Sequence, residues 1–245
     1  MITAAGFAYV GNAFNELPRF ETASVDLIVT DPPYESLEKH RARGTTTRLK
    51  HSKASSNDWF PVIPNSAFPE LFTQFRRVLK PGSHLYLFCD SETAFVVKPM
   101  GEAAGLTFHK PLIWDKITIG MGYHYRCTYE MVLFFSAPGG KRRLNDLGIS
   151  DVLRAKRVRN GYPTEKPESL VRTLIEQSSH TGDLVLDPFC GGGTVPAAAK
   201  RTGRQYLALD IQESAVEYTR ARIARTPNEF ALDLEGKKNA NTPTL

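Results

Sequence analysis

The sequence alternates between two hydrophobic patterns, and this alternation limits the fold more than any other feature. Short runs of apolar, β-branched or aromatic residues are typical of buried strands. We expect seven such strands, at residues 7–10, 25–30, 84–89, 107–114, 129–136, 184–187 and 205–210. Apolar residues spaced three and four apart predict helices between several of them, at 67–79, 165–179, 194–202 and 212–225. Strands that alternate with helices indicate an α/β fold, in which a mostly parallel sheet carries helices on both faces.

The length and the residue types bound the organisation of the chain. A chain of 245 residues suits one large domain, which we place at residues 1–227, and residues 228–245 form a polar tail. No apolar run approaches the roughly 18 residues of a membrane span. The N-terminus has no basic leader or cleavable apolar core, so we expect a cytoplasmic protein. The three cysteines show no C-x-x-C spacing and the six histidines form no H-E-x-x-H motif, which predicts neither a disulfide framework nor a metal site.

Basic residues are concentrated in two segments. The net charge of +5 and the isoelectric point near 9.1 favour a polyanionic partner. Segments 35–58 and 139–160 together hold 13 of the 31 lysines and arginines. The first segment has almost no apolar residue to bury, so it is predicted to be a mobile surface loop.

The first chemical motif is the tetrapeptide from Asp31 to Tyr34, DPPY, which directly follows the strand expected at 25–30. Ligand sites in parallel sheets lie at the carboxyl ends of the strands. The two prolines fix the backbone and supply no N–H, which suits the binding of an amino group by carbonyl oxygens.

An exocyclic amine is a poor nucleophile because its lone pair is delocalised into the ring. Acceptors aimed at its hydrogens, here the Asp31 carboxylate and a prolyl carbonyl, would free that lone pair, and the Tyr34 ring would stack on the base. The alternative is a structural Pro-Pro turn with a capping aspartate.

The second motif is the segment from Asp187 to Thr194, DPFCGGGT, which leads from an expected strand into an expected helix. Its glycines allow a ligand to approach the backbone and the helix N-terminus. The pattern is neither G-x-G-x-x-G nor a lysine-bearing phosphate loop, so a nucleoside with a carboxylate fits better than a dinucleotide or a nucleoside triphosphate. About 20 residues further on, Asp210 ends the next strand, where an acid binds ribose hydroxyls. The alternative is a glycine-rich turn with a capping acid in another kind of α/β protein.

Together the two motifs resemble those of the amino-methylating DNA methyltransferases, in the permuted class whose catalytic motif precedes the cofactor-binding motif. The similarity spans most of the chain. The segment from Tyr162 to Pro167 is also similar to the element that precedes the cofactor loop in this class. The resemblance implies a Rossmann-like, seven-stranded, mostly parallel sheet of the S-adenosylmethionine-dependent methyltransferase type with a circularly permuted motif order. It also implies S-adenosylmethionine as the cofactor.

The resemblance assigns roles to individual residues. The catalytic residues are Asp31, Pro32, Pro33 and Tyr34. The turn from Gly11 to Ala13 resembles the one that lines the adenine of the cofactor, although Asp is commoner than Asn at position 12. The implied cofactor contacts are Asn12, Ala13, Asp31, Thr164, Lys166, Asp187, Phe189, Gly191, Gly193, Thr194, Asp210 and Ile211.

The implied reaction is direct transfer of a methyl group to N6 of adenine in DNA, with the target base flipped out of the duplex. We expect the basic segments to contact phosphates, with a steep salt dependence of binding. Segment 139–160 lies where this class tends to carry target recognition. Because it is short, specificity would be modest or would depend on a second protomer, and homodimers occur in this class. The expected DNA contacts are Lys39, Arg41, Arg43, Arg48, Lys50, Lys53, Arg142, Arg143 and Arg157.

Three other functions stay open on the sequence. N4 of cytosine presents a similar amino group, although Ser is commoner than Asp at the first motif position in the cytosine enzymes. Methylation of RNA or of a protein glutamine usually goes with Asn at that position and with an earlier cofactor motif. A catalytically silent DNA-binding protein on the same fold would require the loss of cofactor binding.

Overall fold

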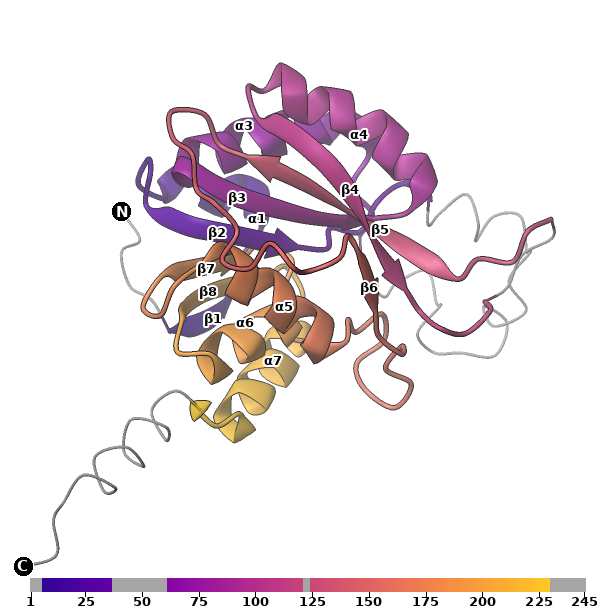
Figure 1. Ribbon diagram of the computed structural model, residues 1–245. Coiled ribbons are helices and arrows are strands. Elements are labelled where there is room, and N and C mark those ends of the chain that lie inside the picture. The colour runs from indigo at the N-terminus through magenta and orange to yellow at the C-terminus, as the bar shows by residue number, and fades with distance from the viewer. Residues whose placement is uncertain (1–5, 37–60, 121–123, 230–245) are drawn as a thin grey trace, which may run out of the picture.

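The computed structural model describes residues 6–36, 61–120 and 124–229. Its strands are β1 Phe7–Val10, β2 Val25–Thr30, β3 Leu79–Cys89, β4 Thr107–Asp115, β5 Tyr129–Ser136, β6 Val152–Arg154, β7 Leu184–Asp187 and β8 Gln205–Asp210. These strands form one sheet in the order β1-β8-β7-β2-β3-β5-β4-β6 (Figure 1). All neighbours pair in parallel except β5, which is antiparallel to both β3 and β4.

Helices cover both faces of this sheet. They are α1 Ala13–Glu16, α3 Phe68–Val78, α4 Ser91–Ala103, α5 Glu168–Ser178, α6 Thr194–Arg201 and α7 Glu213–Arg225, with short 3-10 turns η1 Leu17–Arg19 and η4 Asn65–Ala67. In Figure 1, α3 and α4 lie on one side of the sheet and α5, α6 and α7 on the other. The central strand β2 is buried along its whole length. Its side chains alternate between the faces, since Ile28 packs in one hydrophobic cluster and Leu27 and Val29 pack in the other.

The sequence predictions of secondary structure are largely confirmed. All seven expected strands are present, and β6 is an eighth at one edge of the sheet. Strand β3 begins at Leu79 instead of residue 84, because the first residues after α3 already pair with β2 across an irregular register. Helix α4 was not predicted. It contains Pro99 and Gly101, two residues that disfavour a helix interior, and Asp90 caps its N-terminus by accepting from the Thr93 N–H at 2.8 Å.

Some expectations lie outside the described residues. The loop expected at 35–58 is described only at residues 35 and 36, and the tail 228–245 only at residues 228 and 229. Each helix in the described ranges is too short or too polar to span a bilayer.

The amino end of β2 is held by a buried polar network. Asp26 accepts two hydrogen bonds from Lys80 Nζ, both at 2.8 Å, and one from the Leu184 N–H at 3.0 Å. Arg142 donates to the backbone oxygens of Asp26 and Ser178 at 3.0 and 2.9 Å. His84 lies 2.7 Å from Ser178 Oγ through Nδ1, so the imidazole belongs to the same network.

His84 makes the stability of the fold sensitive to acid. Burial lowers the pKa of His84 from 6.5 to about 4. The unfolded chain therefore takes up a proton near pH 6.5 while the folded imidazole stays neutral, so stability is present above pH 6.5 and is lost as the pH falls toward 4. We expect this site alone to remove up to about 3 kcal/mol of unfolding free energy over that interval.

Urea unfolding of the wild type and of His84→Asn at pH 7.5, 6 and 5 measures this effect. The variant is expected to be less stable at pH 7.5, and its deficit should shrink as the pH falls, because Asn does not titrate. A deficit that stays constant with pH would contradict the assignment.

Candidate active site

A pocket of about 460 Å³ opens where the parallel strands end. Its lining includes Gly11, Asp31, Asp187 and Asp210, which follow or end β1, β2, β7 and β8. The volume lies within the range of about 300–1,000 Å³ that is usual for small-molecule sites. The position is the one expected for a ligand site in a doubly wound sheet.

The structure brings most of the sequence-predicted site residues together in this pocket. The four residues from Asp31 to Tyr34 all line it, as do all but one of the expected cofactor contacts. The exception is Gly193, which forms the N-cap of α6 in the left-handed region with φ +70°. The expected cofactor contacts that line the pocket are Asn12, Ala13, Asp31, Thr164, Lys166, Asp187, Phe189, Gly191, Thr194, Asp210 and Ile211.

Asp31 belongs to a row of four alternating charges. Lys166 Nζ donates to Asp31 Oδ2 and lies 3.4 Å from Glu130 Oε2. Lys116 Nζ lies 2.7 Å from the other oxygen of Glu130. The Lys166 side chain is only 11% exposed, so its ammonium is satisfied by these two carboxylates rather than by water.

The charges in this row set one another's protonation. Burial raises the pKa of Asp31, Lys166 opposes this rise, and Glu130 adds to it. Burial would raise the pKa of Glu130 too, but Lys166 and Lys116 hold it below its usual value. Burial alone would lower the pKa of Lys166, yet Asp31 and Glu130 raise it. Lys166 therefore stays charged, and Asp31 is a stronger base than an ordinary carboxylate.

The two prolines after Asp31 present their carbonyls differently. The Pro33 carbonyl accepts from the Ile63 N–H at 2.7 Å, and this bond fixes the backbone next to Tyr34. Among the described residues, no backbone N–H donates to the Pro32 carbonyl. Lys166 reaches only Oδ2 of Asp31. Within the described residues, the Pro32 carbonyl and Asp31 Oδ1 are thus neighbouring acceptors that a ligand can use.

The glycine loop is closely packed from two sides. A Cβ on Gly192 would lie 2.6 Å from the Cβ of Tyr162, so only glycine fits there. The Gly191 N–H donates to Asp210 Oδ2 at 3.0 Å, and the Gln212 N–H donates to Oδ1 at 2.9 Å. These bonds fix the Asp210 carboxylate at the pocket wall with lone pairs remaining for a ligand.

Asn12 has a local role that explains the residue type. Its side-chain oxygen accepts from the Phe14 N–H at 3.0 Å and caps α1. Asn and Asp are about equally good N-caps. Asn12, at a position where Asp is commoner in the resembled family, therefore caps the turn beside the pocket equally well.

Sequence reasoning missed several residues that the pocket contains. Glu130 is one, because β5 is antiparallel and its first residues meet the edge at which the parallel strands end. Trp114 also lines the pocket, and its Nε1 donates to the Ala155 carbonyl at 2.8 Å. The signal for both lay in Trp114-Asp115-Lys116 and Tyr129-Glu130, which follow the order of the resembled family. Thr164, which is among the expected cofactor contacts, has a positive φ of 61°, a strained conformation at the site.

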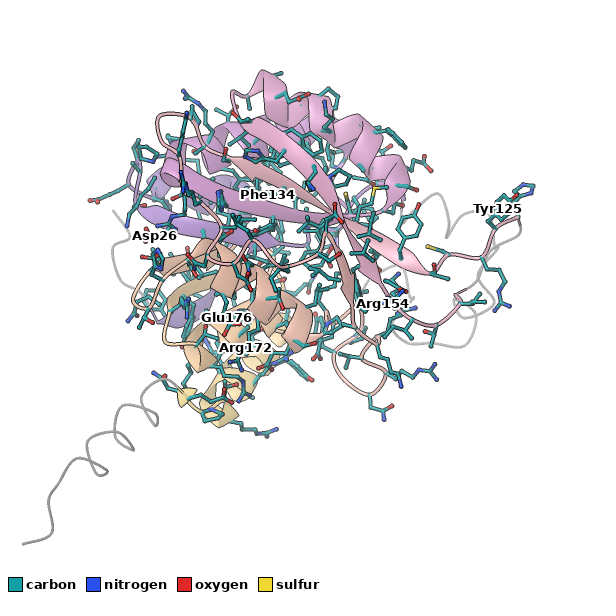
Figure 2. All side chains as sticks on the ribbon, in the orientation of Figure 1. Asp26, Tyr125, Phe134, Arg154, Arg172 and Glu176 are labelled. Atoms are coloured by element: carbon teal, nitrogen blue, oxygen red, sulfur yellow. The ribbon has the colours of Figure 1, made fainter. Side chains whose placement is uncertain are left out.

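The expected DNA contacts fall into three groups. Arg157 is exposed and lines the pocket. Arg142 is bound to Asp26 at the opposite end of β2, and Arg143 is exposed beside it. In Figure 2, Asp26 lies toward one end of the strands and Arg154, the last residue of β6, lies toward the other. Lys39, Arg41, Arg43, Arg48, Lys50 and Lys53 lie outside the described residues.

The segment expected to recognise the target is therefore divided in space. Residues 139–160 cross the length of the sheet (Figure 1), from Gly140 packed against Pro81 to Arg157 at the pocket. Arg142 donates hydrogen bonds to backbone oxygens far from the pocket. Only the carboxyl-terminal part of the segment, which includes Arg157, is therefore placed to contact a substrate there.

The family model described as DNA methylase (N6_N4_Mtase) matches residues 25–221, and the chain belongs to this family. S-adenosylmethionine is accordingly its cofactor and DNA its substrate class.

The chain is also similar to individual relatives and solved structures. The Type II methyltransferase M.HpaI of Haemophilus parainfluenzae is 26% identical over 245 residues, covering 89% of this chain and 74% of the relative. The fold is similar to that of TTHA0409 from Thermus thermophilus, a putative DNA modification methylase complexed with S-adenosyl-L-methionine, with a TM-score of 0.69, 23% identity and 90% and 94% of the two chains covered. It is also similar to the cytosine-N4-specific PvuII DNA methyltransferase, with a TM-score of 0.71, 16% identity and 96% and 92% covered.

Proposed function

We propose that this DNA methyltransferase transfers the methyl group of S-adenosylmethionine to N6 of adenine. The observation that carries the proposal is the pair of adjacent acceptors at the pocket, Asp31 Oδ1 and the Pro32 carbonyl. An aspartate supplies a charged acceptor at the first motif position. By family resemblance this residue favours adenine, whereas Ser is commoner in enzymes that methylate cytosine N4.

The acceptor pair activates the amino group of the base. One hydrogen of the amine is accepted by Asp31 Oδ1 and the other by the Pro32 carbonyl, which draws the nitrogen toward the pyramidal form whose lone pair is free. The Pro33 carbonyl is occupied by Ile63, so it holds the backbone and not the base. Tyr34, a residue that is 8% exposed, lines the pocket, and its ring stacks on the base to fix the plane of the base.

Lys166 holds the carboxylate in place and Asp31 receives the proton. Since Lys166 occupies Oδ2, the carboxylate cannot rotate freely, and Oδ1 remains for the substrate. Burial raises the pKa of Asp31, so its carboxylate takes the proton that the amino nitrogen releases on methylation more readily than an exposed one does.

The residues present fit the cofactor. When bound, S-adenosylmethionine supplies an electrophilic methyl group on a sulfonium. Asp210 would hold the ribose hydroxyls, and the N-terminus of α6 would hold the carboxylate. The pocket also contains Asp187, whose pKa burial raises to about 7. When ionised, these acids and Asp31 favour a positive charge in the pocket over a phosphate.

The proposal requires the base to leave the duplex, because a stacked adenine cannot reach the Asp31 carboxylate in a pocket. Arg157, exposed beside the pocket, is placed to contact a phosphate near the flipped nucleotide. We propose Arg157 as the DNA contact of segment 139–160. Arg142 is excluded from this role because it is bound to Asp26 at the other end of β2.

Nucleoside mass spectrometry after incubation with labelled S-adenosylmethionine and unmethylated genomic DNA tests the proposal. We expect N6-methyladenine, absent in a parallel reaction with Asp31→Ala. If N4-methylcytosine forms instead, the target base is cytosine, and the rest of the proposal is unchanged. If neither methylated base forms although the protein binds the cofactor, the proposed substrate is wrong.

Methylation of cytosine N4 is the second candidate. The similarity of the fold to the cytosine-N4-specific PvuII enzyme favours it, and cytosine offers the same kind of amino group to the same acceptor pair. Duplexes in which only adenine or only cytosine carries a free exocyclic amino group separate the two targets directly.

Glu130 is predicted to tune the pH dependence of the reaction. Its negative charge raises the pKa of Asp31. Glu130→Gln should therefore lower that pKa and shift the acidic limb of the pH–rate profile to lower pH, because Asp31 must be ionised to accept the amino group. The measurement is the initial rate between pH 4.5 and 9 under saturating substrates.

Glu102→Gln is the matched control for this measurement. Glu102 forms an exposed pair with Lys98 at 2.7 Å on α4, so its removal changes the net charge equally without touching the row of charges. A limb that moves equally in both variants, or moves to higher pH in Glu130→Gln, would contradict the role of Glu130.

A further inference from the structure

Arg222 on α7 joins the two segments that build the pocket wall. Its Nη1 donates to Glu165 Oε1 at 2.8 Å and to the Gly192 carbonyl at 3.1 Å. The same nitrogen lies 3.1 Å from Thr194 Oγ1, and Nη2 reaches Glu168 Oε2 at 3.1 Å. The Arg222 side chain is 17% exposed and that of Glu165 is 9% exposed, so these bonds are shielded from water.

The partners of Arg222 are connected to two parts of the pocket, the glycine loop and Asp31. Glu165 accepts the Tyr162 N–H at 2.9 Å through Oε2, and Tyr162 packs against Gly192 in the glycine loop. Thr194 donates to the carbonyl of Lys166 at 3.2 Å, and Lys166 Nζ holds Asp31. One guanidinium thus connects the glycine loop with the residue that orients the catalytic carboxylate.

We propose that Arg222 is a positioning residue that couples cofactor binding to the orientation of Lys166 and Asp31. This inference rests on the proposed function of the pocket. Arg222 does not line the pocket, so it acts through Glu165, Gly192 and Thr194. A cofactor seated in the glycine loop stabilises the arrangement that Arg222 holds, and that arrangement places Lys166 against Asp31.

A neighbouring arginine separates this role from general stabilisation. Arg201 on α6 is 23% exposed and pairs with Glu168 and Glu229, so it belongs to the same surface network of ion pairs as Arg172 and Glu176 on α5 (Figure 2). Arg201 shares Glu168 with Arg222, yet its side-chain bonds within the described part of the chain reach neither the glycine loop nor Glu165.

The test compares Arg222→Ala, Arg222→Lys and Arg201→Ala in the full-length protein. Isothermal titration calorimetry with S-adenosylmethionine alone gives the Kd, steady-state assays on DNA give kcat and KM, and urea unfolding gives the stability. We expect both Arg222 variants to raise the Kd about tenfold or more and to lower kcat, because buried acceptors lose their donor and lysine cannot replace the fork of the guanidinium. Arg201→Ala is expected to lose stability while its Kd and kcat stay close to those of the wild type.

Each outcome decides the inference. A wild-type Kd and kcat in Arg222→Ala would overturn it, and so would an equal rise of the Kd in Arg201→Ala, which would make the effect one of stability. If Arg222→Ala does not fold, Arg222→Lys keeps the charge and the packing of the stem and carries the test. A wild-type protein that binds no S-adenosylmethionine would overturn the proposed function itself, a result distinct from failure of the variants alone.

Discussion

Asp31→Ala is expected to slow methyl transfer by about 10²–10³-fold, the usual loss on removal of one preorganised polar group from an active site. The substitution removes the carboxylate that accepts the amino hydrogen and that later takes the proton. The Pro32 carbonyl, the second acceptor, stays in place. It also leaves Lys166 with Glu130 as its remaining carboxylate partner at 3.4 Å. Single-turnover assays at saturating DNA and S-adenosylmethionine measure this loss on the chemical step.

Asp31→Asn provides the matched comparison. The amide keeps the size of the side chain and one acceptor oxygen but has no charge and cannot take the proton. We expect its rate to fall between those of the wild type and Asp31→Ala, and we expect the rate to fall more than the affinity for S-adenosylmethionine in both variants. A wild-type rate in Asp31→Ala would remove Asp31 from the mechanism, and loss of cofactor binding would assign it to the cofactor site instead.

Gly193→Ala is expected to destabilise the protein by about 2–5 kcal/mol. About 1–2 kcal/mol comes from placing a Cβ in the left-handed region, where Gly193 has φ +70°. The remainder, about 1–3 kcal/mol, comes from overpacking, because the new Cβ would lie 2.6 Å from Thr219 Oγ1 and 3.0 Å from the Thr219 Cα. Thr219 is fully buried and its hydroxyl donates to the Gly191 carbonyl at 2.9 Å, so the glycine loop must shift with it.

Gly182→Ala isolates the backbone contribution. Gly182 has φ +86°, but no atom lies within 4 Å of its ideal Cβ position. Its replacement should therefore cost about 1–2 kcal/mol and leave binding of S-adenosylmethionine unchanged, whereas Gly193→Ala should also weaken that binding. Urea unfolding and calorimetry on both variants make the comparison, and equal losses of stability would show that the loop adapts to the added Cβ.

The elements and motifs of this protein were readable from the sequence because each is written in neighbouring residues. The short run of apolar residues in β2 is typical of a strand that is buried on both faces of a parallel sheet. Asp31 follows β2 and Asp210 ends β8, so the rule that ligands meet the carboxyl ends of parallel strands placed both at one edge. Helix α4 escaped prediction for an equally local reason, since Pro99 and Gly101 oppose a helix that tertiary packing nevertheless stabilises.

Only the tertiary structure decided which charges meet. Asp31, Glu130 and Lys166 are far apart in the chain, and they come together because β5 inserts antiparallel between β3 and β4 and so brings its first residues to the pocket. Arg142 and Arg157 look alike in one basic segment, yet the path of that segment across the sheet puts them at opposite ends. The order and direction of strands depend on how the faces of distant elements pack, and that information is not contained in any short stretch of residues.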